Sequence, residues 1–152
     1  MAELKDRLRS DLTVSMRGRD ELRTATIRMV LTAVTNAEVA GARAREISDD
    51  EVVGVLAKEA KKRRDAADAF RQGGRPDLAE REDAEAAVIA GYLPAPLTDD
   101  ELDALVDAAV AEAGANSLRE MGAVMKRLAT DVAGRADGAR VAAAVKARLA
   151  DA

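Results

Sequence analysis

Two groups of charged residues lie on either side of a Gly-Gly turn and have the types and spacing that chemistry could use. The first is the run Lys58–Asp65, which is rich in lysine and arginine, and the second is the pair Glu82 and Glu85. Two carboxylates three residues apart share one face of a helix, where they could serve as general acid and base or as metal ligands. An arginine of the basic run could instead form a bidentate ion pair with one of these carboxylates.

Helical periodicity places Arg63 on the inward face of its helix. At about 100° per residue, one third of the helical wheel holds the apolar side chains Val52, Leu56, Ala60, Ala67 and Phe70. Arg63 falls within this sector, and Glu82 and Glu85 fall within the apolar stripe of the following helix. An antiparallel hairpin that turns at Gly73-Gly74 brings the three charges level. We predict that Arg63 pairs with Glu82 or Glu85 and that Arg75 shares in the pairing.

This cluster is interpreted either as a structural ion pair that fixes the register of the hairpin or as a functional pocket. The chain contains neither histidine nor cysteine, which removes the commonest general base, any thiol nucleophile and the usual transition-metal ligands. We therefore predict no metal site, no cofactor and no catalytic residues that act in this chain alone. The opposite face of the helix that carries Arg63 presents Lys58, Lys61 and Lys62, which are either solvated or bind phosphate.

The composition predicts an all-α protein. Of the 152 residues 48% are hydrophobic but only 1% are aromatic, and alanine with charged spacers is typical of helices. The N-terminus has no long apolar run and no segment is apolar enough to span a bilayer, so we expect no membrane association and a cytoplasmic location.

Seven helices in two domains are expected. Four helices, including a long hairpin, fill an N-terminal domain of residues 1–93, and a small three-helix bundle forms a C-terminal domain of residues 97–152. The boundary is the segment 91–97, because its two prolines cannot continue a helix. Start signals for the last three helices occur at Thr98, Ser117 and Asp137.

Charge is distributed unevenly in the C-terminal part, although the net charge of the whole chain is only −4. The segment 92–114 contains acidic residues and no basic one, whereas basic residues exceed acidic ones after it. Candidate phosphate contacts in this basic part are Lys126, Arg127, Arg135 and Arg140.

Several spaced motifs together resemble the YqeY family, a group of small proteins related to the tail of the GatB subunit of glutamine-dependent tRNA amidotransferases. In the first half these are Lys58-Glu59, Lys61, Arg63, Asp65, Phe70, Gly74-Arg75-x-Asp77-Leu78, Glu82, Glu85, Tyr92-Leu93-Pro94 and Leu97. In the second half they are Met121-Gly122-x-Val124-Met125-Lys126 and Gly134-Arg135-Ala136-Asp137-Gly138. Ala95-Pro96 departs from the pattern, since many relatives have a polar residue there.

The resemblance implies a helical domain followed by a three-helix tail, and it implies an association with carbon–nitrogen ligases that take nitrogen from glutamine. Three functions follow. The first is an accessory protein that binds tRNA or other structured RNA through the lysines and arginines named above. The second is an adaptor that docks on an amidotransferase or an aminoacyl-tRNA synthetase, without RNA contact, through apolar helix faces or the acidic segment 98–114. The third is participation in amide transfer, with Arg63, Glu82 and Glu85 as the site.

Overall fold

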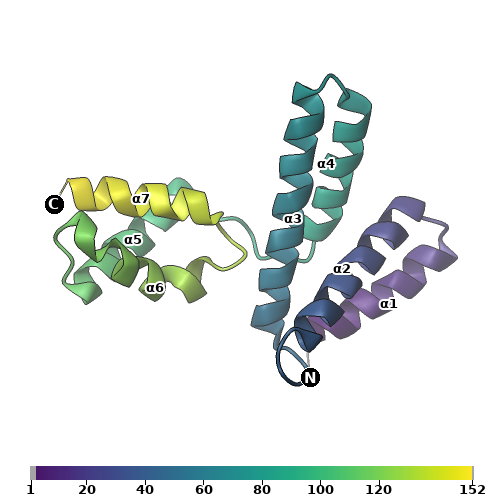
Figure 1. Ribbon diagram of the computed structural model, residues 1–152, viewed down its shortest axis with the longest axis horizontal. Coiled ribbons are helices and arrows are strands. Elements are labelled where there is room, and N and C mark those ends of the chain that lie inside the picture. The colour runs from purple at the N-terminus through teal and green to yellow at the C-terminus, as the bar shows by residue number, and fades with distance from the viewer. Residues whose placement is uncertain (1–2, 152) are drawn as a thin grey trace. The chain divides into compact units, whose positions relative to one another are not determined.

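The computed structural model of the protein describes residues 3–151. This part of the chain contains seven α-helices, one short 3₁₀ helix and no strand (Figure 1), so the prediction of an all-α protein is confirmed. The elements are α1 (Glu3–Arg17), α2 (Glu21–Val39), α3 (Asp49–Gln72), α4 (Pro76–Ala90), α5 (Asp99–Ala113), η1 (Leu118–Glu120), α6 (Met121–Val132) and α7 (Gly138–Ala150).

The chain divides into two compact units, Met1–Leu93 and Pro94–Ala152. Each unit has its own hydrophobic core, and the two cores share no residue. The core of the first unit is built from α1–α4 and includes Leu8, Ile27, Val30, Val34, Val52, Leu56 and Ile89. The core of the second unit is built from α5, α6 and α7 and includes Leu102, Val106, Val124, Leu128, Val141, Val145 and Leu149.

The α3–α4 hairpin is packed through alanines. Ala60 and Ala67 on α3 are buried, as are Ala79 and Ala86 on α4. Each pair is seven residues apart, which is two helical turns and therefore one face. Small side chains on both facing sides let the two helices approach closely along their length. The hairpin turns at Gly74, whose positive φ of 74° suits glycine.

Local signals in the sequence set where these two helices begin. Ser48 and Glu51 form a reciprocal capping box at the start of α3, with the Ser48 hydroxyl accepting from the Glu51 amide. Pro76 occupies the first turn of α4, where its missing N–H costs no hydrogen bond. The long hairpin was therefore predictable from short-range chemistry.

Two large apolar side chains, Met16 and Leu118, are exposed. Met16 is 50% exposed although it continues the spacing Leu4, Leu8, Leu12. A four-residue spacing advances about 40° per step, so the fourth member has drifted off the face of the first. Leu118 is 48% exposed because it lies in the 3₁₀ turn before α6, out of register with the helix that follows.

Candidate functional site

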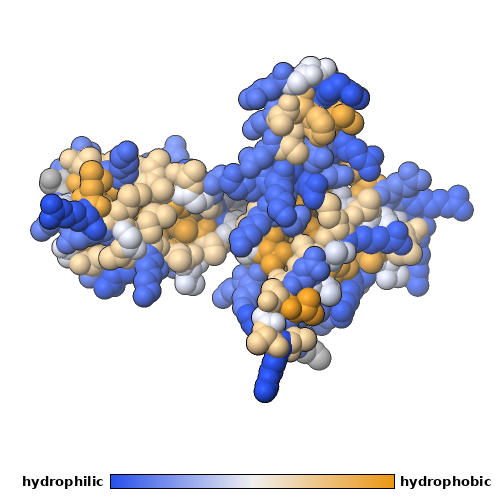
Figure 2. Space-filling view, in the orientation of Figure 1, coloured by the Kyte–Doolittle hydropathy of each residue, from blue (hydrophilic) through white to orange (hydrophobic). Residues whose placement is uncertain are grey.

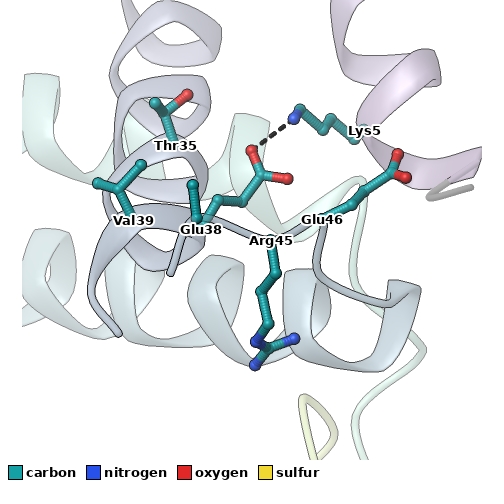
Figure 3. A pocket seen from close by; sticks show the side chains of 7 residues that line it. Lys5, Thr35, Glu38, Val39, Arg45 and Glu46 are labelled. Atoms are coloured by element: carbon teal, nitrogen blue, oxygen red, sulfur yellow. Dashed lines mark hydrogen bonds and ion pairs between the residues drawn. The ribbon is translucent and has the colours of Figure 1, made fainter. Parts of the chain in front are cut away.

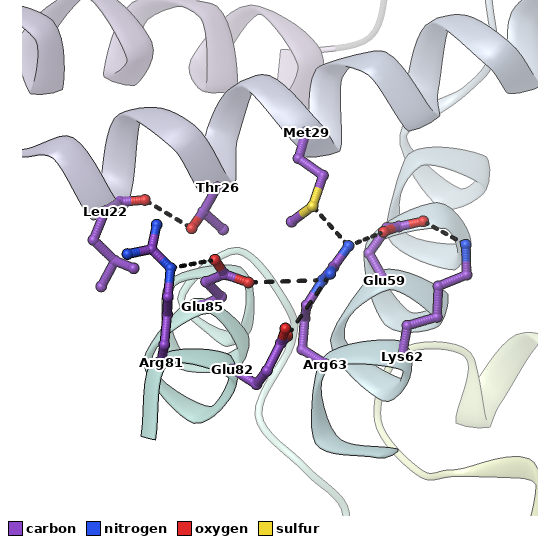
Figure 4. Close-up of polar contacts among 9 residues, drawn as sticks. All are labelled: Leu22, Thr26, Met29, Glu59, Lys62, Arg63, Arg81, Glu82 and Glu85. Carbon is purple, nitrogen blue, oxygen red and sulfur yellow. Dashed lines mark hydrogen bonds and ion pairs between the residues drawn. The ribbon is translucent and has the colours of Figure 1, made fainter. Parts of the chain in front are cut away.

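The structure brings Arg63 of α3 together with both glutamates of α4 (Figure 4). The Arg63 Nη1 atom lies 3.7 Å from Glu82 Oε2, and its Nε atom lies 4.0 Å from Glu85 Oε2. The three side chains are 21%, 18% and 13% exposed, so the charges sit in a seam that is largely closed to water.

Two further residues complete what we call the Arg63 cluster (Arg63, Glu59, Glu82, Glu85 and Met29). Arg63 Nη2 donates a hydrogen bond of 3.3 Å to Glu59 Oε2 and another to the Met29 sulfur on α2. Glu59 is only 7% exposed. Glu59 was not among the residues predicted to join this cluster, although its position four residues before Arg63 on one helix was a usable signal. Met29 has no such signal, since only the packing of α2 brings it near.

The three carboxylates of the Arg63 cluster pair with Arg63 in the seam and with two cations at its rim, Lys62 and Arg81. The two contacts that Arg63 makes to Glu82 and Glu85 on α4 are longer than hydrogen bonds. Both Arg63 Nε and Glu82 Oε2 are buried without a hydrogen-bond partner. Lys62 and Arg81 reach in from the exposed rim, at 3.2 Å from Glu59 and 3.5 Å from Glu85. Burial raises the pKa of Glu85, and the neighbouring Glu82 carboxylate raises it further.

The contacts of the Arg63 cluster form an ion-pair seam between α3 and α4. Thr26, the hydroxyl in the same view, donates to the Leu22 carbonyl oxygen, so it is held by its own helix (Figure 4). Within residues 3–151, no three acidic side chains are placed to hold a metal ion.

The expected participation of Arg75 is wrong, because this arginine forms an ion pair with Asp77 at the exposed turn, 3.2 Å apart. A side chain next to the turn pairs more readily with the first turn of α4 than with a seam further down the hairpin.

The raised pKa of Glu85 gives a testable pH dependence. The folded protein holds a proton on Glu85 at a pH where the unfolded chain has released it, so Glu85 stabilises the fold at low pH. This stability is lost as the pH rises from the ordinary glutamate pKa through the raised value. We expect Glu85→Gln to remove that loss, so that the stability difference between variant and wild type changes across this window.

Urea unfolding of both proteins between about pH 4 and 7 measures the difference directly. Hydrogen bonds from Lys5 and Arg45 lower the pKa of Glu38 and of Glu51, respectively. These two groups make the free energy of unfolding rise with pH, and they do so equally in wild type and in the variant. A constant difference between Glu85→Gln and wild type over the whole range would show that Glu85 titrates normally.

The three predicted lysines of α3 lie on the exposed side of the hairpin. Lys58, Lys61 and Lys62, which we call the α3 lysine face, are all exposed. Lys61 forms an ion pair with Asp65 at 2.9 Å, and Lys62 reaches Glu59. Within residues 3–151, Lys58 has no ion-pair partner. Lys62 therefore lies at the edge of the Arg63 cluster, whereas Lys58 and Lys61 lie further round the helix from Arg63.

Most of the cations predicted in the second unit already have protein partners. Arg135 lies 3.2 Å from Glu101 and also donates to the Ala95 carbonyl oxygen. Arg140 donates to the Leu97 carbonyl oxygen and to Asp99, at 2.8 Å and 2.7 Å. Both arginines thus hold the segment before α5 against the start of α7. Of the four candidates there, Lys126 alone is exposed without an ion pair in the described residues.

Ion pairs join α5 to α6, to α7 and to the loop between these helices in what we call the α5 charge ladder. Its four pairs are Asp99–Arg140, Glu101–Arg135, Asp107–Arg148 and Glu112–Arg127. Surface pairs of this kind contribute about 0–1 kcal/mol each, so they align the helices more than they stabilise them. The uneven charge of the C-terminal sequence is therefore largely explained by helix packing inside this unit.

A second polar cluster surrounds the single tyrosine of the chain. The Tyr92 hydroxyl donates to Asp11 and accepts from Arg23, and the Arg7 guanidinium lies 4.8 Å from the ring centre. Burial and the Asp11 carboxylate raise the pKa of Tyr92 to about 12. The cluster fixes the end of the first unit on α1 and α2. No sequence signal could reveal it, because its partners are 69 and 81 residues from Tyr92.

A hollow of about 390 Å³ lies between the end of α2 and the loop that leads to α3 (Figure 3). Lys5 and Glu38 form an ion pair across it, and their side chains are 11% and 12% exposed. Arg45 points away from this pair and instead bonds Glu51. The Lys5–Glu38 pair thus joins α1 to α2, and Arg45 joins the loop to α3.

Nearly the whole chain matches one family. The family model described as Yqey-like protein matches residues 5–149. The chain belongs to the YqeY-like family. The resemblance noted in the sequence is therefore confirmed, and the match covers both units of this YqeY-like chain.

Curated relatives of the YqeY-like chain carry the name "Altered inheritance of mitochondria protein 41, mitochondrial". The protein of Clavispora lusitaniae is 33% identical over 83% of this chain and 74% of its own length. The protein of Pyrenophora tritici-repentis is 31% identical over 86% of this chain and 71% of its own length. The match to the Lachancea thermotolerans protein, also 33% identical, spans 57% of this chain and 46% of that protein. Within residues 3–151, no helix is long and apolar enough to cross a membrane.

Proposed function

We propose that this YqeY-like chain is an accessory protein that binds structured RNA through phosphate contacts and does not catalyse a reaction by itself. The observation that carries the proposal is the α3 lysine face. Three lysines lie exposed within about one helical turn of α3, and Lys62 at their edge also pairs with the buried Glu59. Lysine ammonium groups placed in this way bind phosphate oxygens and release counterions.

The chemistry of the remaining surface supports phosphate recognition over base recognition. The chain has one tyrosine, one phenylalanine and no tryptophan. Tyr92 is 7% exposed, so its ring is not available to stack on a base. Recognition would therefore follow the shape and backbone of the RNA. Lys126 offers a further contact in the second unit.

The family resemblance suggests tRNA as the RNA and an amidotransferase as the assembly that this chain assists. The names of the relatives place those proteins in mitochondria. For this chain we propose a compartment that contains a translation apparatus, as both the cytoplasm and the mitochondrion do.

The proposal is tested by charge reversal of the α3 lysine face. We expect the triple variant Lys58→Glu, Lys61→Glu, Lys62→Glu to bind unfractionated tRNA about 100-fold more weakly at low salt, and its salt slope to fall by about 2 to 3. Fluorescence anisotropy at about 50 to 200 mM KCl measures both quantities.

A matched control changes the net charge equally at three exposed cations elsewhere. Its substitutions are Arg17→Glu, Arg43→Glu and Lys146→Glu. Equal weakening in control and test variants would mean that only net charge matters. Binding that does not depend on salt would contradict the proposal.

A protein adaptor is the second candidate, and the α5 charge ladder favours it. The ladder already occupies Arg127, Arg135 and Arg140, so the second unit has fewer cations for RNA than its sequence suggests. The same ladder occupies most of the acidic segment 98–114, which leaves Asp100 and Asp103 exposed outside it. In this case the purified chain would form a complex with an amidotransferase or a synthetase in the absence of RNA.

A further inference from the structure

We propose that Arg7 of α1 and Arg23 of α2 form a binding site for a phosphate group beside the ring of Tyr92. Two helices present the guanidinium groups at one place, and both groups remain open to solvent, with side chains 59% and 38% exposed. The site uses no residue of the α3 lysine face. It therefore does not depend on the proposed RNA binding, since its phosphate can come from RNA or from a small molecule.

The tyrosine ring holds the two guanidinium groups in place. Their Cζ atoms lie 4.8 Å and 5.7 Å from the centre of the Tyr92 ring, which is the range of a cation–π contact. Arg23 Nη2 also donates a hydrogen bond of 3.0 Å to the Tyr92 hydroxyl. Tyr92 is itself buried, so the ring is a fixed support. Arginines that are already held in position lose less side-chain entropy when an anion binds.

This cluster carries one more positive charge than negative. The Asp11 Oδ2 atom lies 3.9 Å from Arg7 Nε and 3.6 Å from Arg23 Nη2. Within residues 3–151, no other acidic side chain forms an ion pair with either arginine, including Glu3, one turn before Arg7. Burial and the Asp11 carboxylate raise the pKa of Tyr92 to about 12, so its hydroxyl is neutral at neutral pH. Two cations thus share one anion.

Asp11 leaves most of the guanidinium donors unused. Its Oδ2 atom accepts the hydrogen bond of the Tyr92 hydroxyl, and its distances to the two arginines exceed hydrogen-bond length. A guanidinium has five N–H donors. In the described part of the chain, the Arg7 side chain donates no hydrogen bond, and the Arg23 side chain donates one, to Tyr92. The remaining donors are available to an anion that arrives from solvent.

The arrangement of these donors favours phosphate over a carboxylate. Arginine binds phosphate through parallel N–H···O bonds. Two arginines from separate helices match a tetrahedral group, whose oxygens point in different directions. A carboxylate offers two oxygens in one plane, and a single guanidinium already satisfies both.

The test titrates the full ¹⁵N-labelled chain with sodium phosphate in place of sodium chloride at constant ionic strength, and follows the Arg7 and Arg23 Nε–H signals by NMR. We expect both signals to shift and saturate. With Kd taken from the Arg23 signal, Arg7→Gln should weaken binding about fivefold and Asp11→Asn should tighten it about fivefold, because each removes one charge beside the phosphate. Their matched controls, Arg17→Gln and Glu80→Gln at exposed positions, should change Kd less than about twofold.

Thermal unfolding confirms that each variant is folded. Saturation of the Arg23 signal by tRNA as well as by phosphate would identify a backbone phosphate as the ligand, and saturation by phosphate alone would identify a small phosphate compound. The charge-reversed variant of the α3 lysine face should retain the phosphate response, so the RNA proposal can fail while this site stands. Shifts that grow linearly with phosphate, or equal effects of Arg7→Gln and Arg17→Gln, would overturn the inference.

Discussion

Replacing Arg63 by methionine is expected to lower the free energy of unfolding by about 3 kcal/mol. Removing one member of a buried ion pair costs about 3–5 kcal/mol, because the opposite charge stays behind without its partner. Here three carboxylates stay behind, since Glu59, Glu82 and Glu85 all face the same guanidinium. The Arg63 side chain is still 21% exposed to solvent, so we place the expected loss of stability at the low end of this range. Urea unfolding followed by circular dichroism measures it.

The matched control is Arg64→Met at the exposed neighbouring position, where the change should stay within about 0.5 kcal/mol. Adding Glu59→Gln and Glu82→Gln to the Arg63→Met variant should restore much of the lost stability, because two of the three carboxylates that Arg63 contacts are then neutral. If Arg63→Met proved as stable as wild type, the cluster would hold its charges through solvent and not through the guanidinium.

Replacing Leu128 by alanine is expected to unfold the second unit while the first stays folded. Leu128 is 1% exposed at the centre of the α5–α7 core, and such a truncation costs about 2–5 kcal/mol. A unit of this size has a stability of only about 0.05–0.15 kcal/mol per residue, so the loss removes most of it. Because the two cores share no residue, we expect the signals of the first unit to persist.

Calorimetry and ¹⁵N NMR spectra resolve the two units. In the variant the signals of Val141 and Val145 should collapse at a temperature where those of Val30 and Val34 are unchanged. Leu118→Ala is the matched control, because that leucine is 48% exposed and its truncation should change stability by less than about 0.5 kcal/mol. Joint loss of both sets of signals would mean that the chain unfolds as one cooperative domain.

The hairpin formed by α3 and α4 carries most of the chemistry that this chain offers. Its outer side presents the α3 lysine face and its inner side presents the Arg63 cluster. The second unit contributes less free charge, because the α5 charge ladder pairs its acidic helix with its own arginines.

The sequence alone determined the helical content, most helix starts, and the approach of Arg63 to Glu82 and Glu85. These features depend on capping side chains, prolines, glycines and a two-helix register, all of which act over short stretches of chain. It also determined the family, since the motifs span nearly the whole chain.

Only the tertiary structure decided which charges are available. The sequence could not show that Met29 completes the Arg63 cluster, that Tyr92 is held by Asp11 and Arg23, or that Arg140 is committed to Asp99. Each of these contacts joins helices that are distant in the chain, and its partner follows from packing and not from periodicity. The sequence does not show whether a charged side chain faces solvent or an opposite charge. The electrostatic free energy of that side chain depends on the groups near it in space, which only the packing of the helices determines.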